Sequence, residues 1–156
     1  MKRLNQHRKA AGGFSMIEVL ITLVVLAFGL LGLGLLQTMN LRYTKSANER
    51  TQAVNLAGEI LDMMRSNRSE LATYELPETS LSSVTLPNGG CGASTSLGAK
   101  ANLDRWKCEV REALGESAKV KITPNVATSS VSVDVQWDES NMPGSGQGKI
   151  TLESQL

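Results

Sequence analysis

The sequence predicts an α+β fold, in which one long N-terminal helix is followed by a C-terminal antiparallel sheet. Two observations support this prediction. Apolar residues recur at helical spacing from the first quarter of the chain as far as Arg65. In the last third, apolar and polar residues alternate with a period of two, as in strands that bury one face. The chain has 156 residues, which is enough for one hydrophobic core.

Positive charge is concentrated at the N-terminus. Residues 1–13 hold no acid and four cations, namely Lys2, Arg3, Arg8 and Lys9. The formal net charge of the chain is +1, so residues 14–156 carry +1 − 4 = −3. The one histidine, His7, lies in the same basic stretch. If this stretch is removed, no histidine remains for a catalytic triad or a metal site.

An uncharged apolar run, residues 19–36, follows the basic stretch. As a helix it would span roughly 27 Å, close to the thickness of a membrane core. Positive residues before such a span keep the N-terminus in the cytoplasm and send the rest of the chain across. No small-residue cleavage site follows the run; the cleavable-looking junction, Gly13–Phe14, precedes it. We therefore expect a leader at residues 1–13, a membrane half of the helix at 14–36 and a head at 37–156.

Glu18 is an acid at the start of this apolar helix. A carboxylate at mid-bilayer costs about 2.5–3.5 kcal/mol, and less near the surface. One interpretation is that Glu18 marks the membrane interface, with the helix proper beginning at Val19. The other is that Glu18 pairs with a cation inside an assembly, such as a new amino terminus at Phe14 of a neighbouring copy.

The segment Gly13-Phe14-Ser15-Met16-Ile17-Glu18-Val19-Leu20 closely resembles the class III signal of type IV pilins and pseudopilins. The resemblance implies a type IV pilin-like fold, cleavage after Gly13 by prepilin peptidase and N-methylation of Phe14. It also implies that Glu18 pairs with an N-terminal amine when subunits dock. The expected location is the inner membrane, as a single-pass protein with a periplasmic head, and then the pilus at the cell surface.

Further segments, residues 28–37 and 53–68, resemble a minor-pilin family, the type IV pilus modification protein PilV, as residues 104–106 and 135–138 do more weakly. This resemblance implies a minor pilin that primes or promotes pilus assembly and is incorporated near the tip. The implied partners are prepilin peptidase, the inner-membrane assembly platform, the other minor pilins and the major pilin, with membrane lipid around residues 19–36. The alternatives are a minor pseudopilin of a type II secretion system and a minor pilin for DNA uptake or adhesion.

The helical pattern continues through residues 37–65. Its apolar stripe consists of Leu36, Met39, Tyr43, Ala47, Val54, Ala57, Leu61 and Met64. Joined to the membrane half, it predicts one helix of about 52 residues, whose stripe forms part of the core of the head. Asn67-Arg68-Ser69 ends the periodicity. Three glycines lie inside the apolar run, at positions 29, 32 and 34, and one interpretation is that glycine is simply common in membrane helices. The resemblance to pilins favours the other, which is close helix packing or local unwinding in a filament.

The rest of the chain predicts a helix-and-sheet head. Residues 77–100 have the composition of a loop, with one short strand at 83–86. An amphipathic helix is expected at 103–114, with Gly115 as its stop signal. Alternating residues predict strands around Val120 and Ile122, along 131–137 and around Ile150 and Leu152, the last after a turn at 141–144. Trp106 and Trp137 are expected in the core.

The two cysteines, Cys91 and Cys108, both lie on the exported side. An even pair in an oxidising compartment is most simply a disulfide, and it would close a loop worth about 3 kcal/mol. The chain lacks the ligands for a metal site, and no cofactor or small-molecule substrate is expected. No nucleophile–base pair or phosphate-binding loop is present, so we do not expect an enzyme.

Residues 100–116 contain a set of three acids and a set of four cations. Glu109, Glu112 and Glu116 have the spacing of one solvated helix face and are poor acid/base candidates. The cations Lys100, Arg105, Lys107 and Arg111 cluster locally. The balance of −3 beyond residue 13 nevertheless argues against nucleic-acid binding.

Overall fold

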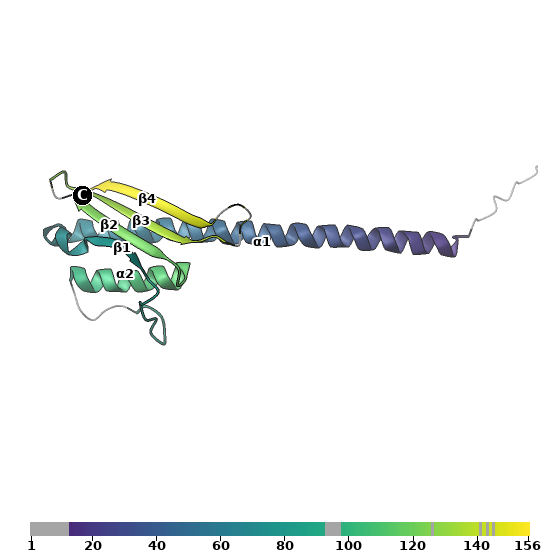
Figure 1. The fold of residues 1–156 in the computed structure, drawn as a ribbon, viewed down its shortest axis with the longest axis horizontal. Coiled ribbons are helices and arrows are strands. Elements are labelled where there is room, and N and C mark those ends of the chain that lie inside the picture. The colour runs from purple at the N-terminus through teal and green to yellow at the C-terminus, as the bar shows by residue number, and fades with distance from the viewer. Residues whose placement is uncertain (1–12, 93–97, 126, 141, 143, 145) are drawn as a thin grey trace, which may run out of the picture. The chain divides into compact units, whose positions relative to one another are not determined.

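The computed structural model describes residues 13–92, 98–125, 127–140, 142, 144 and 146–156, so the cationic stretch with His7 lies outside the described residues. The fold is α+β (Figure 1). Helix α1 (Met16–Ser66) begins it. The chain divides into two compact units: the first ends at Asn40, and the second, which we call the head, is Leu41–Leu156.

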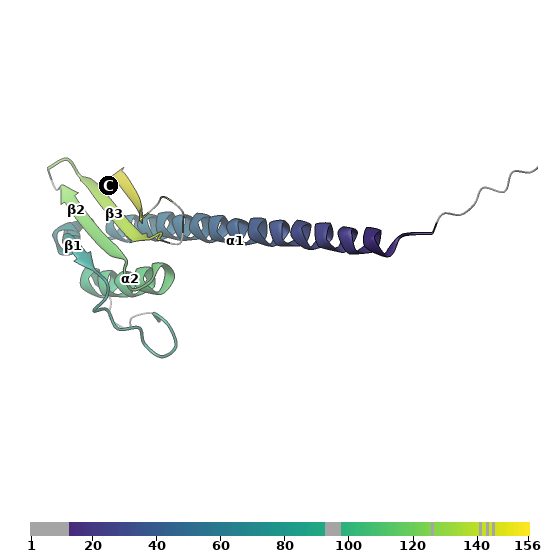
Figure 2. The same ribbon diagram turned by 45° about the vertical axis from the view of Figure 1, so that its right-hand side comes forward.

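The head contains the C-terminal part of α1 and all later elements. In order they are the 3₁₀ helix η1 (Arg68–Tyr74), β1 (Leu76–Ser80), α2 (Ala99–Leu114), β2 (Lys119–Asn125), β3 (Ser130–Asp138) and β4 (Gln147–Gln155). The strands form one sheet in the order β1-β2-β3-β4 (Figure 2). All neighbours are antiparallel, which confirms the predicted sheet.

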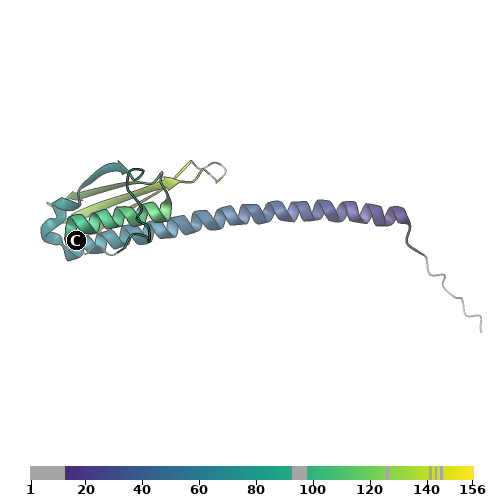
Figure 3. The same ribbon diagram turned by 90° about the horizontal axis from the view of Figure 1, so that it is seen from below.

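One face of the sheet is buried. Val131, Val133, Val135 and Trp137 alternate along β3 and are all at most 2% exposed. On the helical side, the core contains Ala57 and Ile60 of α1 and Trp106 of α2. Helix α2 and the head part of α1 therefore lie side by side on the same face of the sheet (Figure 3). The prediction that Trp106 and Trp137 are core residues is confirmed.

Polar contacts attach the head part of α1 to three other places. Ser46 Oγ donates to Glu139 Oε1 at 2.9 Å, and the same oxygen accepts from Trp137 Nε1 at 3.2 Å. Trp106 Nε1 donates to the carbonyl of Leu56 at 2.7 Å. Near the end of the helix, Arg65 Nη2 donates to Ser154 Oγ of β4 at 2.6 Å. These contacts fix α1 against the segment after β3, against α2 and against β4.

The predicted stripe on α1 is partly wrong. Met39, Tyr43 and Val54 are 38%, 54% and 42% exposed, and burial begins only at Ala53. Ile60, which the stripe omitted, is completely buried. The reason is that α2 and the sheet cover the helix only along its last turns, where positions 53, 57, 60, 61 and 64 share one face.

The strand expected at 83–86 is also wrong. These residues form no strand. The first strand is instead β1, which follows η1, and the sequence pattern indicates neither of these two elements. Leu76 of β1 is buried and pairs opposite Ile122, whereas Leu86 is 42% exposed. Helix α2 begins at Ala99, earlier than predicted. Its end is confirmed: Gly115 has φ 93° and donates its N–H to the Arg111 carbonyl.

Candidate processing and assembly site

The first described residues, Gly13 to Ser15, precede helix α1. Ser15 organises the start of the helix: its carbonyl accepts from the N–H groups of Glu18 (3.0 Å) and Val19 (3.3 Å). Its hydroxyl also accepts from the N–H of Ile17 at 3.4 Å, as a serine before a helix commonly does. The Gly13–Phe14 peptide bond therefore lies outside the helix, and the Phe14 side chain is 86% exposed.

The backbone of this unit does not itself require glycine at position 13. A Cβ atom built there has no neighbouring atom within 4 Å. Packing among the described residues therefore does not explain a glycine at this position.

Glu18 lies in the first turn of α1 and is exposed. Carboxylates are stabilised there, because the N-terminus of a helix carries partial positive charge. Among the residues that the structure describes, no cation forms an ion pair with Glu18. The unit leaves this carboxylate accessible to a positive group of another molecule.

The apolar side chains that follow Glu18 are exposed along the first unit. Val19, Leu26 and Leu36, for example, are 49%, 59% and 59% exposed. Helix α1 is long and apolar enough to cross a membrane, by length and composition. The helix continues unbroken through Gly29, Gly32 and Gly34. The predicted packing or unwinding at these glycines stays a prediction, since nothing lies within 4 Å of a Cβ built at any of them.

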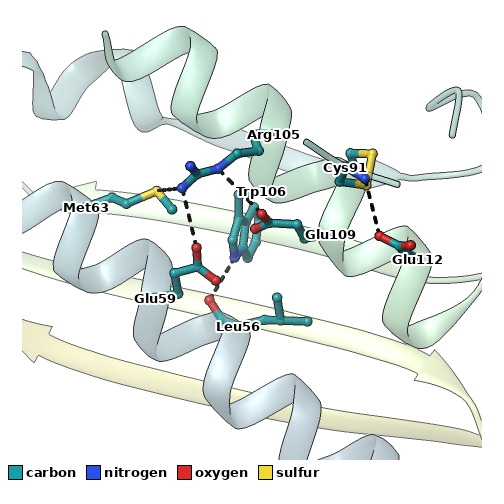
Figure 4. Close-up of polar contacts among 9 residues, drawn as sticks. Leu56, Glu59, Met63, Cys91, Arg105, Trp106, Glu109 and Glu112 are labelled. Atoms are coloured by element: carbon teal, nitrogen blue, oxygen red, sulfur yellow. Dashed lines mark hydrogen bonds and ion pairs between the residues drawn. A yellow bond between two sulfur atoms is a disulfide. The ribbon is translucent and has the colours of Figure 1, made fainter. Parts of the chain in front are cut away.

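In the head, Arg105 connects α2 to α1 (Figure 4). Its Nη2 lies 3.5 Å from Glu59 Oε1 and 3.9 Å from the sulfur of Met63, and its Nε lies 3.5 Å from Glu109 Oε1. One guanidinium thus lies between carboxylates from both helices. Next to it, the buried Trp106 donates its hydrogen bond to α1. Together these side chains hold the two helices in register.

Glu109 corrects the expectation of a solvated acidic face. Its side chain is only 25% exposed. Burial, and then the nearby carboxylate of Glu59, raise the pKa of Glu109 above its ordinary value, while Arg105 acts in the opposite direction. Glu112 also has a structural contact, because its Oε2 accepts from the N–H of Cys91 at 3.5 Å. These acids position the helix and its adjoining loop.

The local cluster of cations on α2 is largely neutralised. Arg105 pairs with Glu59 and Glu109, as described above. Lys107 lies 3.4 Å from Asp104, and Arg111 lies 4.0 Å from Glu116. Such pairing removes most of the field that would attract a phosphate backbone.

The head contains a disulfide between Cys91 and Cys108, with the two Cα atoms 5.7 Å apart. The bond attaches the segment before α2 to the middle of that helix. Part of the intervening loop, residues 93–97, lies outside the described residues. Among the described residues, no three acids, cysteines or histidines are grouped so that they could hold a metal ion.

Comparison with known proteins gives one match. Residues 8–34 match a family described as the prokaryotic N-terminal methylation motif. No curated protein and no solved structure matches the chain. The matched residues include the Gly13–Phe14 junction, Glu18 and most of the apolar run. This match, together with the helix-and-sheet fold, supports a type IV pilin-like protein. The motif implies processing by a prepilin peptidase and assembly with other pilins, and with the apolar helix it fits a membrane-anchored pilin.

Proposed function

We propose that this chain is a minor pilin, which primes or promotes type IV pilus assembly at the inner membrane and is incorporated near the pilus tip. The observation that supports it most strongly is the methylation motif, which covers residues 8–34 and so includes most of the exposed apolar run, with a disulfide-bonded helix-and-sheet head after it. The resemblance of residues 28–37 and 53–68 to minor pilins favours this role over a major pilin. In this proposal the chain has a structural role and is not an enzyme.

In this proposal the N-terminal residues have separate roles. Prepilin peptidase removes residues 1–13 by cutting after Gly13, and the new amine at Phe14 is methylated. Residues 14–36 hold the chain in the membrane and then in the filament, while residues 37–156 carry the head on the periplasmic side. Glu18 supplies the negative charge that the amine of a neighbouring subunit meets during docking. Taking either charge out of water is costly, and in an apolar surrounding the pairing of the amine with the Glu18 carboxylate offsets part of that cost, whereas an unpaired charge would bear all of it.

Replacing Gly13 tests the processing step. Gly13→Val should leave an uncleaved precursor and reduce surface piliation, because a Cβ there meets no described residue, whereas a peptidase that reads glycine excludes it. Gly146→Val is a matched control, since a Cβ at Gly146 also meets open space. Immunoblots and the mass of the N-terminus measure cleavage, and electron microscopy measures piliation. Normal cleavage and piliation in the Gly13 variant would contradict the proposal.

Replacing Glu18 tests the docking step. Glu18→Gln keeps the size of the side chain and removes its charge, so cleavage should proceed while incorporation into pili falls. The control is Glu75→Gln, an exposed acid of the head. The amount of this chain in sheared pili, relative to the amount in membranes, gives the result. Unchanged incorporation would count against a docking role for the carboxylate.

A deletion scored for two phenotypes distinguishes the pilus from type II secretion. A minor pilin predicts fewer pili and lost twitching motility, with protein export unaffected. A pseudopilin predicts blocked protein export, with pili and twitching motility unaffected. Complementation with the full chain is the control for effects on neighbouring genes.

A further inference from the structure

Strand β4 forms one edge of the sheet (Figure 1). It is paired with β3 along its whole length, from Gln147 opposite Asp138 to Gln155 opposite Ser130, without a register shift. The opposite edge strand, β1, is shorter, contains Pro77 and has a register irregularity. Short strands, prolines and bulges protect many sheet edges, and β4 has none of them. Its charged side chains, Lys149 and Glu153, disfavour pairing in any register that does not match them.

The hydrogen-bonding pattern shows which groups of β4 are free. The N–H of Leu156 donates to the carbonyl of Ser129 at 2.7 Å, so these two opposite residues form a hydrogen-bonded pair. Such pairs alternate with non-hydrogen-bonded pairs along an antiparallel ladder. Lys149, Thr151 and Glu153 therefore fall in the non-bonded positions, and their N–H and C=O groups point away from β3. Among the described residues, no other backbone accepts or donates to them.

The side chains of this edge are self-complementary. If a second copy lies antiparallel with its Thr151 opposite the first Thr151, Lys149 of each copy lies opposite Glu153 of the other. On the other face, Ile150 lies opposite Leu152. Both of these apolar residues are only half-buried in one chain. The two-fold axis repeats each pair, as in any symmetric dimer.

Only this register places Lys149 of one copy directly opposite Glu153 of the other. Centring the pairing on Ile150 would place Lys149 opposite Thr151, and centring it on Leu152 would place Lys149 opposite Gln155. Within one chain, Lys149 lies 3.4 Å from Asp134, and its side chain is still 51% exposed. It can therefore reach a second carboxylate without leaving the first.

We propose that β4 is a docking strand for a second copy of this chain, which pairs antiparallel about Thr151 and extends the sheet across both heads. One strand pair is small compared with a standard protein interface. The contact is accordingly weak in dilute solution and strengthens where two heads are held close together.

The direction of the strands limits where this contact forms. In the head, β4 and the residues 41–66 of α1 run the same way (Figure 1). Antiparallel pairing reverses the second copy, so its helix segment runs in the opposite direction. If the proposed pilus function holds, the contact joins heads on separate filaments, because subunits within one filament are inserted in the same direction.

Cross-linking of the purified full chain in detergent tests the pairing without requiring any pilus. Thr151→Cys, treated with a short bismaleimide, should give a covalent dimer on denaturing gels. Lys121→Cys is the control: it is exposed too, but lies on the inner strand β2. No dimer with Thr151→Cys, or equal yields from both variants, would overturn the proposal. The native cysteines are bonded to each other and do not react.

A charge swap tests the register. Glu153→Lys places like charges opposite each other at two positions, so the dimer yield from Thr151→Cys should fall by roughly tenfold or more. Adding Lys149→Glu to it should restore part of the yield, because the new carboxylate lies opposite the lysine introduced at position 153 of the other copy but also close to Asp134 of its own chain. Emission from the buried tryptophans checks that each variant is folded. A double swap that stays as low as Glu153→Lys would overturn the Thr151-centred pairing. Normal piliation in the deletion strain, with dimerisation of the purified chain intact, would reject only the proposed function.

Discussion

Gly148 of β4 lies directly against the indole ring of Trp137. A Cβ built at Gly148 would lie 2.6 Å from Trp137 Nε1 and closer still to Cε2 and Cζ2. The ring has little freedom to move, because it is 1% exposed and its Nε1 donates to Glu139. The absence of a side chain at position 148 is what allows this tryptophan to occupy the core above β4.

Gly148→Ala should therefore destabilise the head strongly. Overpacking of a core costs about 1–3 kcal/mol, and a displaced ring also loses a hydrogen bond worth about 1 kcal/mol. We expect a loss of about 3 kcal/mol, or roughly 10 °C in Tm. The chain has two tryptophans, Trp106 and Trp137, so urea unfolding followed by tryptophan emission reports on the head alone.

Two further variants test whether the loss of stability comes from the contact between position 148 and Trp137. Gly146→Ala meets open space, so its unfolding midpoint should match that of the unchanged chain. Trp137→Phe supplies a smaller ring, and combined with Gly148→Ala it should cost less than the sum of the two single changes. A Gly148→Ala variant within about 0.5 kcal/mol of the unchanged chain would refute the argument, as would strict additivity in the double variant.

Two predictions concern the contacts of α2. Replacing both Cys91 and Cys108 with serine should lower the stability of the head by about 3 kcal/mol, measured by urea unfolding, and reductant should then have no further effect; an unchanged midpoint would contradict this. Because the pKa of Glu109 is raised in the folded chain above its ordinary value of 4.5, the folded state binds this proton more tightly than the unfolded state does. The stabilisation from the protonated carboxyl is therefore fully present below pH 4.5 and is lost as the pH rises through the folded-state pKa. Glu109→Gln should therefore gain stability relative to the unchanged chain between pH 4 and pH 7, which melting curves across this range would measure, whereas a constant difference would count against it.

The regular parts of the fold were predictable because their signals are local. Alternation along 131–137 specifies a strand with one buried face, and β3 buries those residues. The stop at Gly115 depends on a backbone conformation that glycine adopts readily. The methylation motif lies within one short segment, so its residues could be recognised without knowledge of the fold.

The misses concern residues whose environment is set by distant parts of the chain. Val54 and Ile60 both fit a helical stripe, and only the placement of α2 and the sheet decides which of them is buried. Glu109 has the spacing of a solvated face but is partly buried beside Glu59, which precedes it by 50 positions. Strand β1 has no alternating pattern and is held by its pairing with β2. The open edge of β4 likewise becomes visible only from the strand order.

The attachment of α1 to the head has a mechanical consequence. The helix is held at Ser46, Leu56 and Arg65 by three different parts of the head, and its buried face packs on the core between Ala53 and Met64. A pull along the helix axis therefore loads these contacts together, in shear, rather than opening them one after another. Separating the helix from the rest of the head by such a pull therefore requires the three contacts and the buried face to give way at once.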